Sequence, residues 1–285
     1  MKRSFLSLCV ITAATFTIVS CKQEAKPLFD MPIGVQAYTY RASFPKNIVQ
    51  VLDTIKNLGI TEVEGFSLNG VNPDSLKQML KDRNLTMPSI GADYDSLAAN
   101  PAYILKAAKL FDCKFVMVSW IPHDSTFSIN EAKKAVEDFN RAGKILQENG
   151  ITLCYHTHGY EFSKYGDGTL LDYIIQNTDP KYVSYELDML WTFHGGGNAV
   201  ELLTKYKDRF KLVHLKDIRK GIANDLTGAT DIKNDVALGT GQIDIPAILK
   251  AAKAAGVKHY FIEDESPSHA AQIPVTIAYL KSLKE

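Results

Sequence analysis

The stretch AGKILQENGITLCYHTHGYEF, residues 142–162, combines the end of a helix, a buried strand and a polar strand end. Its helical part ends at Gly150, and glycine is the residue type that most often ends a helix. The run 151–155 is short and apolar, as expected for a parallel strand covered by helices. His156, His158 and Glu161 then follow closely. The stretch predicts a helix–strand unit whose strand ends in groups that can bind a ligand.

The same alternation of strand-like and helix-like segments continues from residue 33 to the C-terminus. The helical segments carry apolar residues three and four apart, as Leu52, Ile55 and Leu58 do. The nine strand candidates are residues 33–40, 60–66, 85–92, 113–120, 151–156, 183–190, 210–217, 236–241 and 258–265. Eight β–α pairs in this length predict one α/β domain, a (β/α)8 TIM barrel over residues 33–285. An open, doubly wound sheet is the alternative.

Composition narrows the class of protein further. The 285 residues are 46% hydrophobic and 22% charged, which is typical of a folded chain with a substantial core. The formal net charge of +0 lacks the basic excess of most polyanion-binding proteins, so we expect no nucleic-acid partner. The polar segment 219–235 follows a strand candidate, and we interpret it as an active-site loop.

The N-terminus indicates export. Residues 1–20 form a signal peptide with a positive start and a short apolar run. The run ends IVSC, which resembles the lipobox of bacterial lipoproteins and implies that Cys21 is lipidated. Residues 21–32 then form a lipidated tether, and the protein is expected in the periplasm or at the outer membrane, touching the membrane only through its lipid. Cys113 and Cys154 are interpreted as small core residues; a disulfide between them is the weaker alternative.

Polar side chains occur at the ends of most strand candidates, often spaced by two so that each pair shares one side of its strand. These residues are Gln36, Tyr38, Tyr40, Glu62, Glu64, Ser119, Trp120, His156, His158, Glu186, Asp188, His214, Lys216, Glu263 and Glu265. In a barrel all these strand ends open on one face. Two histidines and two carboxylates there, His156, Asp188, His214 and Glu263, suit one divalent metal such as Mn, Co, Fe or Zn.

Six segments resemble, in order, the xylose isomerase-like TIM-barrel superfamily of sugar isomerases and epimerases. They are GVQAYTYR at 34–41, EVEGF at 62–66, ELDMLW at 186–191, VHLKD at 213–217, LGTGQIDIPAIL at 238–249 and FIEDE at 261–265. The superfamily's relatives include tagatose 3-epimerases, inosose dehydratases and apurinic endonucleases, and its barrels often pair as homodimers.

The resemblance implies one metal held by Glu, Asp, His and Glu at strand ends. Asp188, His214 and Glu263 match three of these positions. The first position is His156 here rather than glutamate, and His158 or Glu161 could supply that ligand instead. The symmetric pair of glutamate bases of the epimerases is therefore incomplete.

The chemistry implied is removal of a proton next to a carbonyl that the metal polarises. Glu263, His158 and Lys216 are the candidate catalytic residues. Glu64, Glu161, Trp120 and Trp191 are candidates to contact substrate, the tryptophans through apolar ring faces. One base suffices for isomerisation, dehydration or β-elimination, and export favours a non-phosphorylated ketosugar or keto-glycoside as substrate.

Two other functions fit parts of the sequence. A carbohydrate-binding lipoprotein that keeps the barrel without turnover would explain the missing glutamate ligand. Nucleic-acid repair, as in the apurinic endonucleases, is disfavoured by the neutral charge and the export signal.

Overall fold

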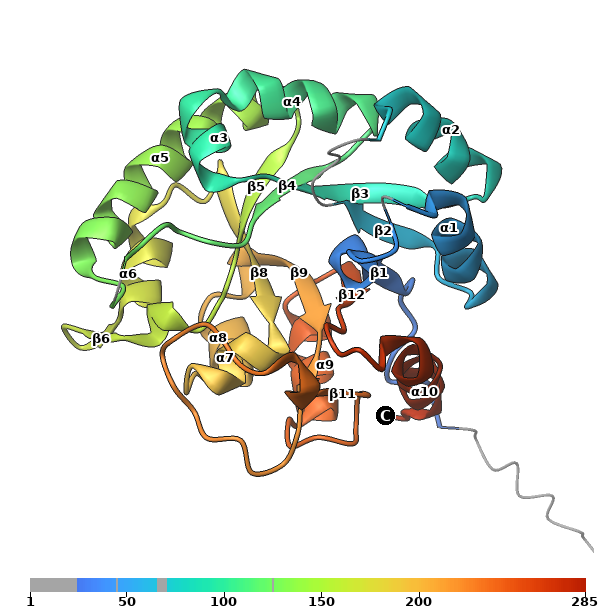
Figure 1. The fold of residues 1–285 in the computed structure, drawn as a ribbon. Helices are drawn as coiled ribbons and strands as arrows, with labels where there is room; N and C mark the ends of the chain where they lie inside the picture. The colour runs from blue at the N-terminus through green and yellow to red at the C-terminus, as the bar shows by residue number, and fades with distance from the viewer. Residues whose placement is uncertain (1–24, 45, 66–70, 125) are drawn as a thin grey trace, which may run out of the picture.

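The computed structural model describes residues 25–44, 46–65, 71–124 and 126–285, so the predicted signal peptide and Cys21 lie outside the described residues. Within these ranges eight parallel strands close into a barrel (Figure 1). In order around the barrel they are β1 (Gly34–Gln36), β2 (Glu62–Gly65), β3 (Thr86–Gly91), β4 (Phe115–Val118), β5 (Thr152–His156), β8 (Val183–Asp188), β9 (Phe210–Leu215) and β12 (His259–Ile262). The predicted TIM barrel is confirmed, and the open sheet is excluded.

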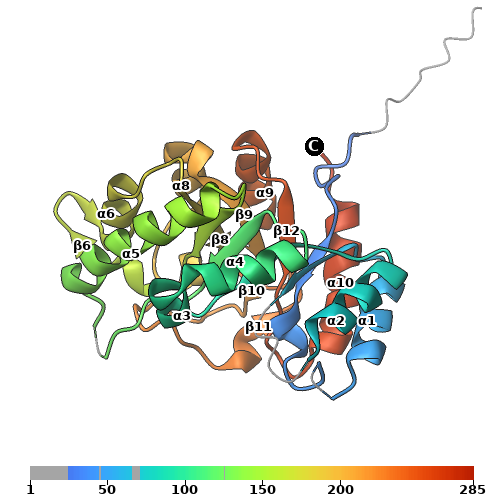
Figure 2. The ribbon, with the colours of Figure 1, turned by 90° about the horizontal axis from the view of Figure 1, so that it is seen from above.

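Helices cover the outside of the barrel (Figures 1 and 2). They are α1 (Ile48–Asn57), α2 (Pro73–Asp82), α3 (Tyr94–Ala99), α4 (Pro101–Leu110), α5 (Ile129–Gln147), α6 (Leu170–Asn177), α7 (Met189–His194), α8 (Ala199–Lys205), α9 (Ile245–Ala254) and α10 (His269–Ser282). Local signals set several boundaries: Ser128 and Glu131 form a capping box at the start of α5. Gly150 follows the same helix at φ +74°, a left-handed conformation that glycine adopts without strain. No helix in the described part of the chain is long and apolar enough to cross a membrane.

The prediction of a barrel strand at 236–241 was wrong. Only Val236 of that segment is in a strand, as part of β11 (Asp235–Val236), which pairs antiparallel with β10 (Asp217–Ile218) outside the barrel. The glycine-rich remainder turns around Asp217, whose carboxylate accepts the backbone N–H groups of Gly239 and Gly241 at 3.0 and 2.9 Å. Strand β9 consequently pairs directly with β12.

Two smaller differences from the prediction concern the end of the first strand and the segment before it. The first strand ends at Gln36 and continues as a 3-10 helix, Ala37–Tyr40. In the segment predicted as tether, Leu28 and Phe29 are buried and Leu28 donates to the Leu283 carbonyl, so this part packs beside the end of α10. Other short elements are 3-10 turns at Tyr160–Phe162, Lys207–Arg209 and Ile232–Asn234, and the hairpin β6 (Lys164–Tyr165) with β7 (Gly168–Thr169).

The inside of the barrel is layered. Cys154, Leu212 and Phe261 form an apolar cluster, with Phe115 packed against it. Both cysteines of the described chain, Cys113 and Cys154, are buried free thiols, as expected. Because side chains alternate along a strand, the next inward positions toward the strand ends are two residues further on. These positions hold His156, His214 and Glu263, so the alternation that builds the apolar layer also delivers the polar groups above it.

Gly143 lets helix α5 lie close to the barrel, and its replacement tests the packing. A Cβ at Gly143 would lie 2.8 Å from the Tyr182 carbonyl oxygen. Alanine is favoured over glycine inside a helix by about 1 kcal/mol, but crowding a packed contact costs about 1–3 kcal/mol. We expect Gly143→Ala to lower the free energy of unfolding in urea, whereas Lys133→Ala at an exposed position of α5 should leave it within about 0.5 kcal/mol. A Gly143→Ala protein more stable than wild type would contradict this packing.

Candidate active site

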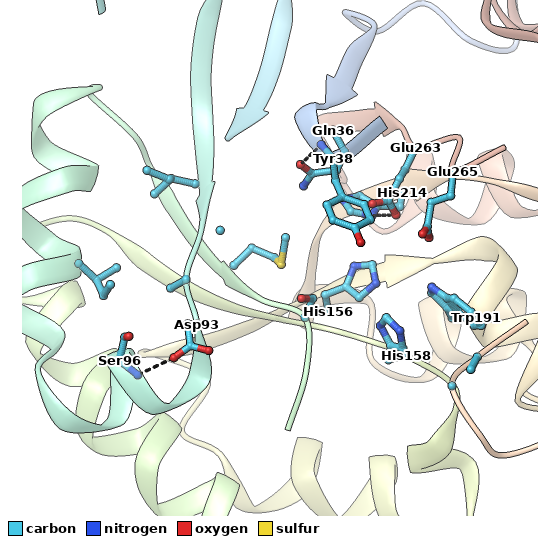
Figure 3. A pocket seen from close by; sticks show the side chains of 18 of the residues that line it. Gln36, Tyr38, Asp93, Ser96, His156, His158, Trp191, His214, Glu263 and Glu265 are labelled. Carbon is cyan, nitrogen blue, oxygen red and sulfur yellow. Dashed lines mark hydrogen bonds and ion pairs between the residues drawn. The ribbon is translucent and has the colours of Figure 1, made fainter. Parts of the chain in front are cut away.

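A cavity of about 730 Å³ opens where the strands end. The residues labelled in Figure 3 come to it from distant parts of the chain. Gln36 ends β1 and Tyr38 follows it, His156 ends β5 and His158 follows it, His214 lies one residue before the end of β9, and Glu263 and Glu265 follow β12. Gly228, Ala229 and Thr230, from the segment 219–235 that was predicted to be an active-site loop, also line it. The strand-end groups therefore share one cavity, as expected for a barrel.

Three of the four predicted metal ligands converge at the base of this cavity. Ligand atoms of His156, Asp188 and His214 all lie within 4.8 Å of one another, and all three residues are buried. Asp188 Oδ2 lies 3.8 Å from His156 Nε2 and 3.7 Å from His214 Nδ1. Glu263 Oε2 adjoins the group at 3.2 Å from His214 Nδ1. Because β9 and β12 are direct neighbours, Glu263 is closer to His214 than an intervening strand would have allowed.

Asp188 provides the test of whether a cation fits. Its Oδ1 accepts the Trp191 backbone N–H at 2.7 Å, so Asp188 is the N-cap of helix α7. Its Oδ2 is buried and has no hydrogen-bond partner. A buried carboxylate oxygen without a partner is costly, and burial raises the pKa of Asp188. A divalent cation between this oxygen and the two imidazoles would supply the missing partner, and the two-nitrogen, two-oxygen donor set suits Zn, Mn, Fe or Co.

The geometry favours His156 over His158 or Glu161 as the first ligand. His156 Nε2 faces Asp188, while its Nδ1 lies 3.1 Å from Glu186 Oε2. Burial lowers the pKa of His156 well below its ordinary value, so the ring is a neutral imidazole with a free electron pair. His156, at the position where the resemblance implies a glutamate, therefore still offers a donor atom.

Glu64 lies beneath the site rather than in contact with the cavity. It accepts hydrogen bonds from Gln36 Nε2 at 2.7 Å and from the Ser89 hydroxyl. Its Oε2 also lies 2.6 Å from His214 Nε2. A carboxylate on the far nitrogen of a ligating histidine fixes the ring's tautomer and orientation. Glu64 is fully buried and is not among the described residues that line the cavity, so its contact with substrate stays a prediction.

Glu186 was not among the predicted site residues. It is fully buried, its Oε2 lies 3.2 Å from His214 Nε2, and its Oε1 has no partner. Burial raises the pKa of Glu186 well above its ordinary value, and the nearby Glu64 adds to the shift. Its spacing of two from Asp188 was the available signal, because that spacing puts both side chains on the inner side of β8.

Lys216 compensates the negative charge of this region. Its Nζ donates to Glu263 Oε2 at 3.0 Å and to Glu265 Oε1 at 2.8 Å, and lies 5.3 Å from the centre of the Trp191 ring. Burial alone would lower the pKa of Lys216, but the two glutamates raise it well above its ordinary value. Lys216 is thus a fixed positive charge behind the cavity wall.

The same charges act on Glu263 and His214. Burial alone would raise the pKa of Glu263, but Lys216 and His214 lower it well below its ordinary value, so the carboxylate stays ionised. Burial alone would lower the pKa of His214, but Glu186 and Glu263 raise it well above its ordinary value. In the protein without a cation, a proton on His214 therefore supplies part of the positive charge that this site requires.

Comparison with known proteins places this geometry in a family. The family described as Xylose isomerase-like TIM barrel matches residues 52–283. The chain belongs to the xylose isomerase-like TIM-barrel family. This membership agrees with the closed barrel and with the strand-end position of the site.

Several members of the xylose isomerase-like family are measurably similar. An inosose dehydratase of Geobacillus kaustophilus is 28% identical over 199 residues, 61% of this chain and 63% of that protein. The chain thus spans less than two thirds of that relative's length. The crystal structure of a sugar phosphate isomerase/epimerase from Parabacteroides distasonis is 25% identical, with a TM-score of 0.73 over 87% of this chain and 97% of that one. A structure described as IOLI protein with a binding zinc atom shares the fold, with 14% identity and a TM-score of 0.69 over 88% and 96% of the two chains.

His158 lies between an aromatic ring and the cavity. Its ring stacks on Trp191, with centroids 4.7 Å apart and planes at 21°, and its buried Nδ1 has no partner. Burial lowers the pKa of His158 to about 3, and the Lys216 charge adds to the effect. His158 therefore lines the cavity as a neutral imidazole. Trp120, predicted to contact substrate, instead packs its ring edge-on against His158 at 5.1 Å and does not line the cavity.

Glu161 holds His158 in place and does not line the cavity. Its Oε1 accepts the His158 backbone N–H at 2.9 Å and the Tyr155 hydroxyl. The Tyr155 hydroxyl lies 3.0 Å from that of Tyr160, which accepts the Ile121 backbone N–H at 2.8 Å. Glu161 is therefore a buried anchor for the turn after β5, in place of the predicted substrate contact.

The titration of Glu161 can be measured through stability. Burial raises its pKa from 4.5 to about 7, partly offset by the hydrogen bond from Tyr155. The folded protein then retains a proton that the unfolded chain releases, so this group lowers stability as pH rises from about 4.5 to about 7. Relative to Glu161→Gln, the wild-type free energy of unfolding should fall by about 3 kcal/mol across that interval.

Measuring the pH dependence of stability in Tyr155→Phe separates the effect of the hydrogen bond on the Glu161 pKa from the effect of burial. Removing the Tyr155 hydroxyl takes away a hydrogen bond that favours the ionised carboxylate, so the fall should extend to higher pH and become larger. Identical pH profiles for wild type and Glu161→Gln would contradict the assignment.

Proposed function

We propose that this protein is a divalent-metal-dependent enzyme that removes a proton next to the carbonyl of a non-phosphorylated ketosugar or keto-glycoside. The outcome would be isomerisation, epimerisation, or loss of a neighbouring group. The observation that carries the proposal is the unpartnered, buried Asp188 Oδ2 facing His156 and His214 at the base of a cavity. The relatives named inosose dehydratase and sugar phosphate isomerase/epimerase support the reaction class.

His156, Asp188, His214 and Glu263 would hold the metal, with Glu64 orienting His214 from behind. A bound divalent cation polarises a carbonyl oxygen and stabilises the negative charge that develops when the adjacent proton leaves. This chain's own residues must bind the sugar and move that proton.

Glu263 is the best-placed base, because its carboxylate lines the cavity next to the candidate metal ligand His214. Lys216 donates to its Oε2 at 3.0 Å and holds it in place. His158 is the second candidate acid or base, because it lines the cavity while Lys216 and Glu161 are occupied behind the wall. Trp191 lines the cavity beside His158 and offers an apolar ring face to a sugar.

The charge of the cavity supports a substrate without phosphate. None of its described lining residues is lysine or arginine, whereas Glu263, Glu265 and Asp93 carry carboxylates. A phosphate group usually requires such cations or a ring of backbone N–H groups. The N-terminal pattern of residues 1–21 adds a second argument, since an exported, lipid-anchored enzyme would rarely meet sugar phosphates. Export, lipidation of Cys21 and a homodimer remain predictions.

Metal content tests the proposal first. The purified protein should bind about one equivalent of Mn, Co, Fe or Zn per chain, measured by elemental analysis after dialysis. Asp188→Ala and His214→Ala should each lose it, because each removes a donor from a site with few alternatives. Glu64→Gln should retain the site but weaken the affinity about 10–100-fold.

His259→Ala is the matched control. His259 also pairs with a glutamate, Glu62 at 2.9 Å, but at the opposite end of the barrel, so its loss should not change metal content. A wild-type protein that binds sugar yet takes up no metal would favour the carbohydrate-binding alternative. Circular dichroism of each variant distinguishes a lost site from a lost fold.

Proton exchange tests the reaction itself. In deuterated water, the metal-loaded protein should exchange the proton next to the carbonyl of a 3-keto-glucoside, followed by NMR. Glu263→Gln should slow exchange by about 10²–10⁴-fold, the usual contribution of a general base. Glu62→Gln at the other end of the barrel should not. Exchange that proceeds equally in Glu263→Gln would exclude Glu263 as the base.

A further inference from the structure

The cavity extends well beyond the candidate metal ligands at its base. In Figure 3, Asp93 and Ser96 lie on the opposite side of the cavity from Trp191 and Glu265. The wall on that side comes from the end of β3, from β4 and from helix α4. We call this part the apolar arm and define it by Ile90, Ala92, Ile104, Ala107 and Met117, with Tyr103 beside them.

The apolar arm differs in chemistry from the base of the cavity. Its five defining side chains carry no hydrogen-bonding group except the weak thioether of Met117. Asp93 is engaged in capping helix α3, where its Oδ1 accepts the Ser96 backbone N–H at 2.9 Å. Tyr103 is 67% exposed although it is a large aromatic residue. Exposed aromatic and apolar side chains at a cavity often mark a ligand contact.

A free monosaccharide would bind unfavourably in the apolar arm. Its hydroxyl groups would lose water against Ile90, Ile104 and Met117 without gaining hydrogen bonds, which is unfavourable. The cavity volume of about 730 Å³ falls in the range that holds drug-sized ligands. A ligand that fills both parts must be polar at one end and apolar at the other.

We propose that the apolar arm binds an uncharged, apolar group, best an aromatic ring, that is joined by a glycosidic bond to the sugar at the base of the cavity. This inference rests on the proposed function, because it takes the carbonyl of the sugar to lie at the candidate metal ligands. The lack of lysine and arginine among the described lining residues excludes a carboxylated or phosphorylated group as the preferred occupant.

The apolar arm also suits a leaving group. When the proton leaves the carbon between the carbonyl carbon and the anomeric carbon, its C–H electron pair can form a double bond to the anomeric carbon. The glycosidic C–O bond then breaks, and the departing oxygen takes up a proton. Atoms and electrons balance without an oxidant or reductant, and the released alcohol or phenol would remain in the apolar arm.

The experiment compares two substrates that differ only in this group. Proton exchange by the metal-loaded protein is measured with methyl 3-keto-β-D-glucopyranoside and phenyl 3-keto-β-D-glucopyranoside. Burial of the ring should give the phenyl compound a KM at least about tenfold lower. Ala107→Leu narrows the apolar arm and should remove this preference by raising the KM of the phenyl compound to about that of the methyl compound.

Two further variants keep the result interpretable. Tyr103→Ala, at a largely exposed position that is safe for folding, should raise the KM of the phenyl compound more than that of the methyl compound. Lys106→Ala, exposed on the same helix, should change neither substrate. Equal KM values for the two substrates, unaffected by Ala107→Leu, would overturn the apolar arm while the proposed function stands.

Failure of the proposed function would look different. If wild-type protein exchanges neither substrate, calorimetry with phenyl and methyl β-D-glucopyranoside tests the apolar arm without turnover. Tighter binding of the phenyl compound that is lost in Ala107→Leu would support the apolar arm, and equal binding would overturn it.

Discussion

The arrangement depends on the balance of buried charge at the top of the barrel. Glu64, Glu186, Asp188 and Glu263 lie there at 9% exposure or less, together with His156, His214 and Lys216. Carboxylates removed from water are stable only when they are paired, hydrogen-bonded or bound to a cation. Lys216 and His214 compensate Glu263, and Gln36, Ser89 and His214 satisfy Glu64.

Two oxygens in this group make no hydrogen bond, Asp188 Oδ2 and Glu186 Oε1. His214 Nδ1 and Lys216 Nζ lie 3.7 and 3.9 Å from Asp188 Oδ2, beyond hydrogen-bonding distance. A protein stabilised only for folding would gain from apolar residues at these positions. A bound cation would give these oxygens the partner that they lack, and this single requirement connects the barrel, the site and the proposed chemistry.

The barrel meets that requirement through a simple geometric rule. Alternation along each strand places an apolar layer of Cys154, Leu212 and Phe261 below and the ionisable groups above. The apolar layer separates the ionisable groups from the other end of the barrel, while the open strand ends admit a ligand. The segment after β9 closes one side of the cavity through Gly228, Ala229 and Thr230.

Sequence patterns alone were enough to predict the barrel and three of the converging ligand types, because helix periodicity, glycine boundaries and spacing by two are local properties of the chain. They misplaced 236–241, since an apolar run beside glycines does not reveal that Asp217 binds its backbone N–H groups. Only the fold decided that Glu64 and Glu161 support histidines and that Glu186 joins the centre. Those roles depend on contacts between strands far apart in the chain, such as Glu64 with His214, and no local pattern records which side chain a barrel places opposite another.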